Sequence, residues 1–533
     1  MRRRAFWLLF ALGATLRLGL YLSRPSLSID ETMTSLEIGA RSFAGLLHPL
    51  AYEQTAPPLF LWGVKLCILI GGMNEYALRV VPLIAGLLVP YLVWRVGLRV
   101  LEPAAALLAT GIAGAAPTLV QYSVIAKPYM TDAVIALVLA QCTLRVLDHP
   151  EERGAWAWLG VAGIAAALGS IAAPFLLGGV GVAVFVGLKP RTAGGTGLLA
   201  ALVGVWGVVF LVLYQSLYRP VATSTYMHVF WSGAFLSPLH IAGWELAGRA
   251  VIQSLVTRPI PALVIPPVIL VLVLGFTVLA RRGGRAPAAL LGIPVLAVLI
   301  ASPLHRYPLS ARVLLGVAPT FALCAAAGLA ALSRGQRIVG RGFGALVVAL
   351  LGAVNILHPY RTPALRPAIR TIAAAAVGDP VYISSGAIPA WALYTTDWSS
   401  PDTGYLESIR RWGGLPDAPG FHNLAPRGRA VMETDGGSDV RRLGRVEILG
   451  LAPGIQWREV VGLSGRSPDA GWAATEAARI KQSGPTVWLL IATAYAGTRD
   501  SLFAALGIAG GRIEVDTVVG GVERSRVGFA GPP

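Results

Sequence analysis

Two adjacent carboxylates, Asp30 and Glu31, stand a few residues after the first apolar run of the chain. A carboxylate in such a place can accept the proton of an attacking hydroxyl group that comes within about 3 Å of it. The same pair also suits the start of a helix, with Asp30 as the N-cap and Glu31 near the positive helix end. Spacing alone leaves both roles open, and the two are compatible.

Cationic side chains lie in other segments that border apolar runs. Lys127 stands directly before Pro128 in QYSVIAKPYMTD (121–132), and proline suits the first turn of a helix. A cation beside a helix start at a membrane interface suits a phosphate, but snorkelling towards lipid headgroups explains Lys127 equally well. Further cations of this kind are Arg79 and, in the loop LHRYPLSAR (304–312), His305, Arg306 and Arg312.

The composition shows which kind of protein must position these groups. The chain has 533 residues, of which 55% are hydrophobic and only 13% charged, which excludes an ordinary cytosolic enzyme or a disordered protein. Residues 1–358 hold 26 Lys and Arg against 11 Asp and Glu, whereas residues 359–533 hold 18 against 16. The excess positive charge therefore lies in loops between apolar runs, as in a membrane protein, and we expect no nucleic-acid partner. The three cysteines lie in apolar runs and imply neither a disulfide framework nor a zinc site.

Eleven apolar runs are long enough to cross a membrane, for which about 17–20 residues are needed. The first is expected to be an uncleaved helix, because no small-residue cleavage site follows it. The predicted spans are 5–22, 79–98, 104–121, 130–147, 155–170, 173–188, 196–215, 260–280, 287–303, 311–332 and 340–357.

A further run, 57–72, is short, opens with two prolines and contains Lys65. If it does not span, fifteen basic residues against four acidic ones fall in short cytoplasmic loops; if it does, most of these clusters lie outside. The positive-inside rule thus predicts an interfacial or re-entrant helix on the outer face, a cytoplasmic N-terminus and an external C-terminal tail. This topology, in the cytoplasmic (inner) membrane, brings ionisable groups of several segments to the outer face: Asp30, Glu31, Glu53, Arg79, Lys127, Asp132, His305 and Arg306.

The chain from residue 359 onwards has a soluble composition in which helix and strand patterns alternate, as in a small α/β domain. We therefore predict two domains, a membrane domain over 1–358 and an external domain over 359–533. The expected fold is an all-α polytopic membrane bundle of about eleven spans with outer-face juxtamembrane helices, followed by a soluble α/β domain. The external stretch 216–259 is rich in aromatic residues, which suit either an interfacial belt or a ligand groove.

Five motifs occur in the order found in one known group of membrane enzymes. They are the Asp-Glu pair after the first helix, YEQTAPPLFLW (52–62), GMNEYALRVVPLIAG (72–86), SVIAKPYMTD (123–132) and HRYPLSARVLLGVAP (305–319). With them the chain resembles the polytopic glycosyltransferases of the GT-C superfamily, in particular the family 39-like branch of protein O-mannosyltransferases and lipid A aminoarabinose transferases. The resemblance implies a GT-C type bundle.

The resemblance also implies an activity, namely transfer of a monosaccharide from a polyprenyl-phosphate donor to an acceptor at the outer face of the membrane. Asp30 matches the family's catalytic base, with Glu31 beside it. Because a polyprenyl phosphate is a good leaving group, one base and cations on the departing phosphate suffice, without the second carboxylate of a glycosidase. The candidate phosphate ligands are Arg79, Lys127, His305 and Arg306, and the candidate substrate-binding residues are Glu53, Gln54, Tyr129 and Asp132.

Some features depart from the family or leave choices open. Lys127 stands where many relatives have Arg, so that a bidentate phosphate clamp becomes a point charge. No metal-binding Glu and His pattern of the relatives is matched, so no metal site is predicted and no cofactor is expected, while dependence on a divalent metal is left open. The expected partners are the lipid-linked donor, membrane lipids and an acceptor that is a protein, a lipid or a glycan. The alternative function is a transporter or flippase for a polyprenyl-linked substrate, although nearly charge-free spans favour an interfacial enzyme.

Overall fold

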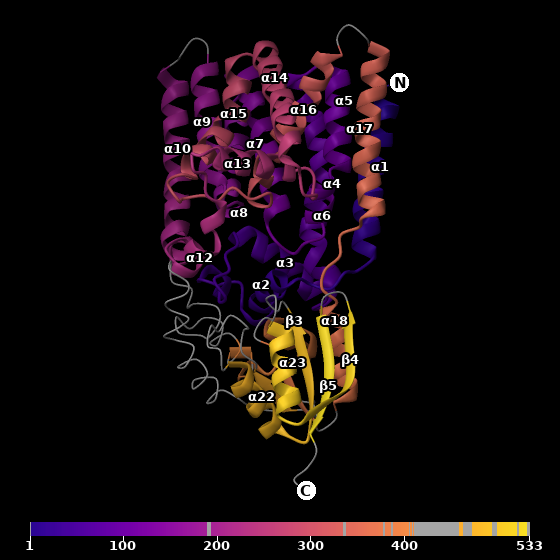
Figure 1. Ribbon diagram of the computed structural model, residues 1–533. Helices are drawn as coiled ribbons and strands as arrows, with labels where there is room; N and C mark the ends of the chain where they lie inside the picture. The colour runs from indigo at the N-terminus through magenta and orange to yellow at the C-terminus, as the bar shows by residue number, and fades with distance from the viewer. Residues whose placement is uncertain are drawn as a thin grey trace.

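The computed structural model describes residues 2–188, 193–333, 337–376, 379–384, 387–404, 406–407, 409, 458–461, 472–492, 498–519 and 522–529. A bundle of helices forms its larger part, and a small sheet with its own helices lies at one end of the bundle (Figure 1). We refer to the end that faces the sheet as the outer end. The predicted combination of a helical bundle with a C-terminal sheet is confirmed.

Each of the eleven predicted spans contains a helix. The bundle helices are α1 (Arg2–Leu22), α4 (Glu75–Val100), α5 (Pro103–Ala115), α6 (Pro117–Tyr122), α7 (Tyr129–Asp148), α8 (Arg153–Gly169), α9 (Ala173–Gly187), α10 (Ala193–Leu213), α14 (Ile265–Gly283), α15 (Arg285–Ala301), α16 (Ala318–Leu332) and α17 (Arg337–Leu357). Within the described residues, six helical segments are long and apolar enough to cross a membrane, whereas α5, α9, α15 and α16 are shorter apolar helices. Eleven crossings therefore stay a prediction.

Two of the predicted runs differ in detail from single helices. The run 104–121 is divided between α5 and α6 at Pro117, which has no N–H to continue the helical bonding. The run 311–332 becomes the helix α16 only at Ala318, after the short 3-10 helix η5 (Val313–Gly316). Both interruptions lie towards the outer end, where polar side chains gather.

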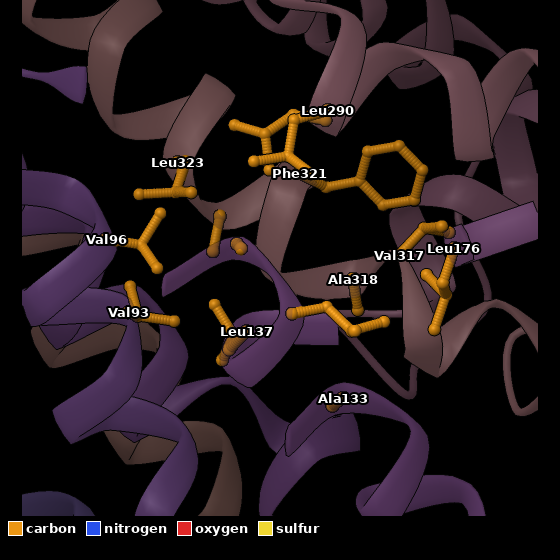
Figure 2. Close-up of a cluster of buried hydrophobic side chains, with 14 of the residues drawn as sticks. Val93, Val96, Ala133, Leu137, Leu176, Leu290, Val317, Ala318, Phe321 and Leu323 are labelled. Carbon is orange, nitrogen blue, oxygen red and sulfur yellow. The ribbon is translucent and has the colours of Figure 1, made fainter. Parts of the chain in front are cut away.

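The bundle core is apolar and closely packed. Val93 and Val96 of α4 lie across from Leu137 of α7 and Phe321 and Leu323 of α16 (Figure 2). Small residues allow α14 and α16 to approach closely, because a Cβ at Gly275 would overlap the carbonyl group of Cys324. Such packing is typical of helices that associate within a membrane, where burial of apolar surface gives little driving force.

Arg17 is a fully buried charge within α1 that the sequence analysis did not single out. Its guanidinium group donates to the carbonyl oxygens of Gly13, Ala113 and Gly114 at 2.6–3.0 Å and to Ser123 Oγ at 3.1 Å. Arg17 uses carbonyl groups at the C-terminal end of α5, which have no partner within that helix. It thereby ties α1 to α5 and to the loop after α6.

Two short helices cover the outer end of the bundle, next to the sheet (Figure 1). They are α2 (Ile29–Ala40) and α3 (Pro58–Gly71), with the 3-10 helix η1 (Gly45–Leu47) between them. The 14 residues of α3 extend only about 21 Å, less than the roughly 30 Å hydrocarbon thickness of a bilayer. Lys65 of α3 donates to the carbonyl groups of Ile38 and Gly39 at the end of α2. The length of α3 is consistent with the predicted non-spanning helix.

The start of α2 differs from the expected one. The N-cap is Ser28 and not Asp30, since the Ser28 hydroxyl accepts the Glu31 amide and Glu31 accepts the Ser28 amide in a capping box. Asp30 therefore lies in the first turn of α2 and does not cap the helix.

Residues 214–264 form several short elements beside the bundle. These are η2 (Tyr214–Tyr218), α11 (Arg219–Ala222), α12 (Thr225–Phe230), η3 (Ser232–Ala234), α13 (Ile241–Gln253) and η4 (Ala262–Val264). Among the aromatic residues of this stretch, Trp244 is half exposed and Trp231 lies against the cation of Arg312. At least one of them therefore borders the site described below.

The C-terminal part consists of a five-stranded mixed sheet with helices on both faces. Its elements are α18 (Leu365–Ala375), β1 (Pro380–Ile383), α19 (Ile388–Thr395), β2 (Arg458–Val461), α22 (Trp472–Ser483), β3 (Thr486–Ala492), α23 (Thr498–Ile508), β4 (Gly511–Val519) and β5 (Val522–Phe529). The strand order is β2-β1-β3-β5-β4, with parallel pairs around β1 and antiparallel pairs around β5. The predicted strand–helix alternation is confirmed, whereas the closing antiparallel hairpin β4–β5 was not foreseen.

The sheet shares a hydrophobic core with α2 and α3 that continues across the predicted boundary at residue 358. Trp391 of α19 and Leu490 of β3 belong to the same buried cluster as Met33, Leu36 and Phe60. The polar hub of this contact is Glu75 at the start of α4, which accepts bonds from the side chains of Arg24, Arg366 and Tyr394. The sheet therefore helps to hold the segment that carries Asp30.

Candidate active site

Asp30 is the carboxylate of the outer end that substrates can reach. Its side chain is 47% exposed and accepts a hydrogen bond from Arg312 at 3.0 Å. Arg312 follows the loop after α15, and its guanidinium group lies over the ring of Trp231 at 4.9 Å. Burial lowers the pKa of Arg312, but charge interactions with Tyr129, Asp30 and Tyr122 and the hydrogen bond to Asp30 outweigh it, so that the pKa is raised.

Glu31, predicted beside Asp30 as a catalytic carboxylate, has instead the contacts of a structural one. Its side chain is fully buried. One oxygen accepts from Arg79 Nε at 3.0 Å and the Ala126 amide at 2.8 Å, and the other from Arg79 at 3.1 Å and the Ser28 amide at 2.9 Å. These four bonds fill the acceptor capacity of a carboxylate. Glu31 thus joins three segments: the start of α2, α4 and the Lys127 loop.

Arg79, predicted as a phosphate ligand, is only 1% exposed and faces Glu31. Besides its two bonds to that carboxylate, it donates to the carbonyl groups of Pro25 at 2.6 Å and Ser26 at 3.1 Å. Four of the five guanidinium N–H groups are therefore used within the protein. The buried Arg79–Glu31 pair therefore has the contacts of a structural ion pair next to the site.

Lys127 lies in the loop between α6 and α7, close to Asp30. Its ammonium group donates to Thr34 Oγ1 at 2.6 Å and to Gln54 Oε1. Burial lowers the pKa of Lys127 to about 8, with the Asp30 charge acting in the opposite direction and Arg312 in the same one. Three predicted site residues, Asp30, Gln54 and Lys127, are thus brought together, although the ammonium group has no acidic hydrogen-bond partner within the described residues.

Tyr129 and Asp132, from the first turn of α7, continue the site towards the bundle interior. Tyr129 packs edge-on against Tyr122, with ring centroids 5.4 Å apart, and interacts electrostatically with Arg312, Asp30 and Asp132. Asp132 is buried and hydrogen-bonded to Ser170, yet its Oδ1 has no hydrogen-bond partner among the described residues. Because buried polar atoms are nearly always paired, this oxygen is suited to a ligand hydroxyl group or a water molecule.

The remaining predicted site residues are His305, Arg306 and Glu53. His305 has a left-handed φ of 56° and packs on Phe235, with ring centroids 4.5 Å apart. His305 and Arg306 are exposed, and in the described part of the chain the hydrogen bonds and ion pairs of the Asp30, Lys127 and Arg312 side chains go to other residues. Glu53, with a left-handed φ of 54°, is half-buried in the turn that positions Gln54.

Arg312, which pairs with Asp30, is not among the phosphate ligands predicted from the sequence. The sequence analysis names it as a cation of the loop 304–312 but takes His305 and Arg306 of that loop as the candidate ligands. The signal that distinguishes it is its position directly before the helical segment that starts with η5, the same place that Lys127 takes before α7. Trp231 could not be singled out, since its partner lies 81 residues away in the sequence.

No group of three or more His, Cys, Asp or Glu side chains within the described residues is arranged to hold a metal ion. The expectation that the protein has no metal site stays a prediction. The arrangement that is present consists of one accessible carboxylate, two cations and a buried carboxylate with a free oxygen.

The fold and the site together define a multi-pass membrane protein with a polar, partly cationic centre at the outer end of its helical bundle. Residues 55–186 match the family of dolichyl-phosphate-mannose-protein mannosyltransferases. The matched part runs from the turn before α3 to α9 and contains Arg79, Lys127, Tyr129 and Asp132. The predicted resemblance to protein O-mannosyltransferases is thereby confirmed for this part of the chain.

Solved structures resemble the chain more loosely. ArnT from Cupriavidus metallidurans, in the apo state, shares 17% identity and a TM-score of 0.44 over 98% of this chain and 99% of that one. The same protein bound to undecaprenyl phosphate shares 16% identity and a TM-score of 0.45 over 99% of both chains. The oligosaccharyltransferase of Archaeoglobus fulgidus, in complex with Zn and sulfate, shares 14% identity and a TM-score of 0.47 over 73% of this chain and 61% of that one. No curated protein sequence matches the chain.

Proposed function

We propose that the protein is a glycosyltransferase that moves a monosaccharide from a polyprenyl-phosphate donor to an acceptor at the outer face of the cytoplasmic membrane. The observation that carries this proposal is the accessible Asp30 carboxylate next to two cations, Arg312 and Lys127. The match of residues 55–186 to dolichyl-phosphate-mannose-protein mannosyltransferases supports it, because it includes the Lys127 loop.

The chemistry follows from these groups. An acceptor hydroxyl oxygen attacks the anomeric carbon of the sugar while the bond from that carbon to the phosphate oxygen breaks. The hydroxyl proton passes to Asp30, and the electron pair of the broken bond stays on the polyprenyl phosphate. Arg312 and Lys127 stabilise the charge that develops on the departing phosphate, and the free oxygen of Asp132 binds a sugar hydroxyl group.

Five residues have a different proposed role from the one predicted by the sequence. Glu31 and Arg79 act as positioning residues that fix the start of α2 against α4. Arg312 joins Lys127 as a phosphate ligand, whereas His305 and Arg306 lie on the rim, where they suit the lipid headgroups around the donor.

A direct test offers the purified protein, in liposomes, a panel of polyprenyl-phosphate sugars and follows release of the free polyprenyl phosphate by mass spectrometry. We expect release with at least one donor in the presence of acceptor, and none with Asp30→Asn at the same protein concentration. If sugar lipids cross the liposome membrane intact and none is cleaved, the alternative function of a transporter applies instead.

The proposed orientation places the sheet outside the cytoplasm. Arg512 of β4 is exposed, so a cysteine introduced there is accessible to a thiol reagent. We expect it to react with a membrane-impermeant reagent in intact cells, as the positive-inside rule requires. Labelling only after the membrane is permeabilised would contradict the proposed topology.

The pKa of Lys127 predicts a pH dependence of donor binding. Only the protonated ammonium group attracts the phosphate, and in the free protein its pKa is about 8. The donor KM should therefore rise as the pH increases through about 8, and stay flat below it. Lys127→Arg, which keeps its charge at every accessible pH, should have a flat donor KM from pH 6.5 to 9.5.

Loss of the charged contact in Lys127→Ala should cost about 1.5–3 kcal/mol, which raises the donor KM roughly 10- to 100-fold at pH 7. An equal rise of the KM above pH 8 in the wild type and in Lys127→Arg would assign the titration to another group.

A further inference from the structure

A pocket lies at the outer end of the bundle, between the ends of α1 and α17. Its volume is about 750 Å³. Its walls come from the ends of α1, α6 and α17, from the loop after α13 and from the segment that leads from α17 to the sheet. α1 and α17 both pack against α5 at this edge of the bundle (Figure 1).

One wall of this pocket is apolar and continuous with the surface that faces the bilayer. It is formed by Leu16 and Leu20 of α1, Val120 of α6 and Ile356 and Leu357 of α17. The two leucine-rich helices α1 and α17 lie in segments that can cross a membrane, and Ile356 and Leu357 are largely exposed. An acyl or prenyl chain in the bilayer therefore has direct access to this wall.

The lining of the pocket is also cationic. Arg258, Arg361 and His358 belong to it, and none of the lining residues is acidic. Arg258 and Arg361 are exposed, and neither forms an ion pair with any residue that the structure describes. Two unpaired guanidinium groups near a lipid surface attract an anionic headgroup, and arginine binds phosphate in a bidentate manner.

We propose that this pocket binds a membrane lipid with a net anionic phosphate headgroup, whose chains lie along α1 and α17. The pocket is separate from the Asp30 centre, because α6 stands between them. Gln121 of that helix lines the pocket and hydrogen-bonds Tyr360, whereas the next residue, Tyr122, packs against Tyr129 of the centre. The lipid site does not depend on the transfer reaction and can be tested without it.

Two kinds of variant separate the polar and the apolar parts of the site. Arg258→Gln with Arg361→Gln removes both arginine charges of the lining. Gly19 lines the pocket, and a Cβ there would meet no atom within 4 Å, so we use Gly19→Leu to place an apolar side chain in this part of the pocket. The matched controls are Arg370→Gln with Arg512→Gln, two exposed cations outside the pocket, and Gly178→Leu, a helical glycine on α9 with equally free space.

The experiment measures lipid binding to the full-length protein by native mass spectrometry, with phosphatidylglycerol, phosphatidylcholine and inorganic phosphate as probes. The wild type should prefer phosphatidylglycerol to phosphatidylcholine. At about 1 kcal/mol for each cation, the double arginine variant should bind phosphatidylglycerol roughly 10- to 30-fold more weakly, and its control less than about twofold. Gly19→Leu should weaken binding of phosphatidylglycerol, whereas Gly178→Leu should not.

Three outcomes would overturn the proposal. Equal phosphatidylglycerol affinity in the double arginine variant and its control would show that the cationic lining binds no headgroup. An unchanged affinity in Gly19→Leu would show that no chain occupies the apolar part. Binding of inorganic phosphate as tight as that of phosphatidylglycerol would make the cationic lining a site for free phosphate and not for a lipid.

Discussion

Asp30→Asn should lower the turnover of sugar transfer by roughly 10²–10⁴-fold, the usual contribution of a general base, while the protein stays folded. The asparagine oxygen can still accept the bond from Arg312, so that the loop after α15 keeps its place. The half-exposed ion pair and the position in the first turn of α2 each contribute less than about 1 kcal/mol to stability. The measurement is kcat with a saturating donor, together with a thermal unfolding curve in detergent.

The control for this prediction is Arg312→Gln. If Asp30 served only to orient Arg312, both variants would raise the donor KM to a similar degree. We expect Arg312→Gln to raise the donor KM, because a phosphate contact is lost, and Asp30→Asn to lower kcat at unchanged KM. Transfer at the wild-type rate by Asp30→Asn would remove Asp30 from the role of base.

The order of the helices could be predicted from the sequence because each needs a long apolar run, and such runs are read from composition alone. The exceptions lie at the outer end. Pro117 divides a predicted span, and the first part of another is the 3-10 helix before Ala318. Arg17 shows why the interior of a span is harder to predict. The carbonyl groups that pair with it belong to helix ends about one hundred residues later in the chain.

The site was predicted in part, since neighbours in sequence were easier to find than neighbours in space. The loop motif around Lys127 indicated the cation, and the YEQ segment supplied its partner Gln54. The pairing of Asp30 with Arg312 joins residues 282 positions apart, and no local pattern indicates it. The role of Ser28 was visible in principle, because Ser-x-x-Glu is the capping-box spacing. The sequence analysis instead takes Asp30 as the N-cap, which places the helix start two residues too late.

Glu31→Gln should lower the stability of the protein and leave its turnover largely unchanged, whereas Asp30→Asn should lower turnover and leave stability largely unchanged. The change removes the charge that balances Arg79 and leaves a buried, uncompensated guanidinium group. Breaking such a pair costs about 3–5 kcal/mol of unfolding free energy. We therefore expect a lower thermal unfolding temperature and a lower yield of folded protein. The protein that remains folded should keep most of its transfer rate per molecule.

A double-mutant cycle decides whether the pair is the cause. In Glu31→Gln with Arg79→Met both charges are absent, so the buried arginine no longer lacks a partner. The double variant should be more stable than the sum of the two single changes predicts, by about 1–3 kcal/mol. It should still be less stable than the wild type, because Arg79 also donates to Pro25 and Ser26. If Glu31→Gln instead kept the wild-type unfolding temperature and lost its turnover, Glu31 would be a reacting carboxylate and Asp30 its partner, as the sequence alone also allowed.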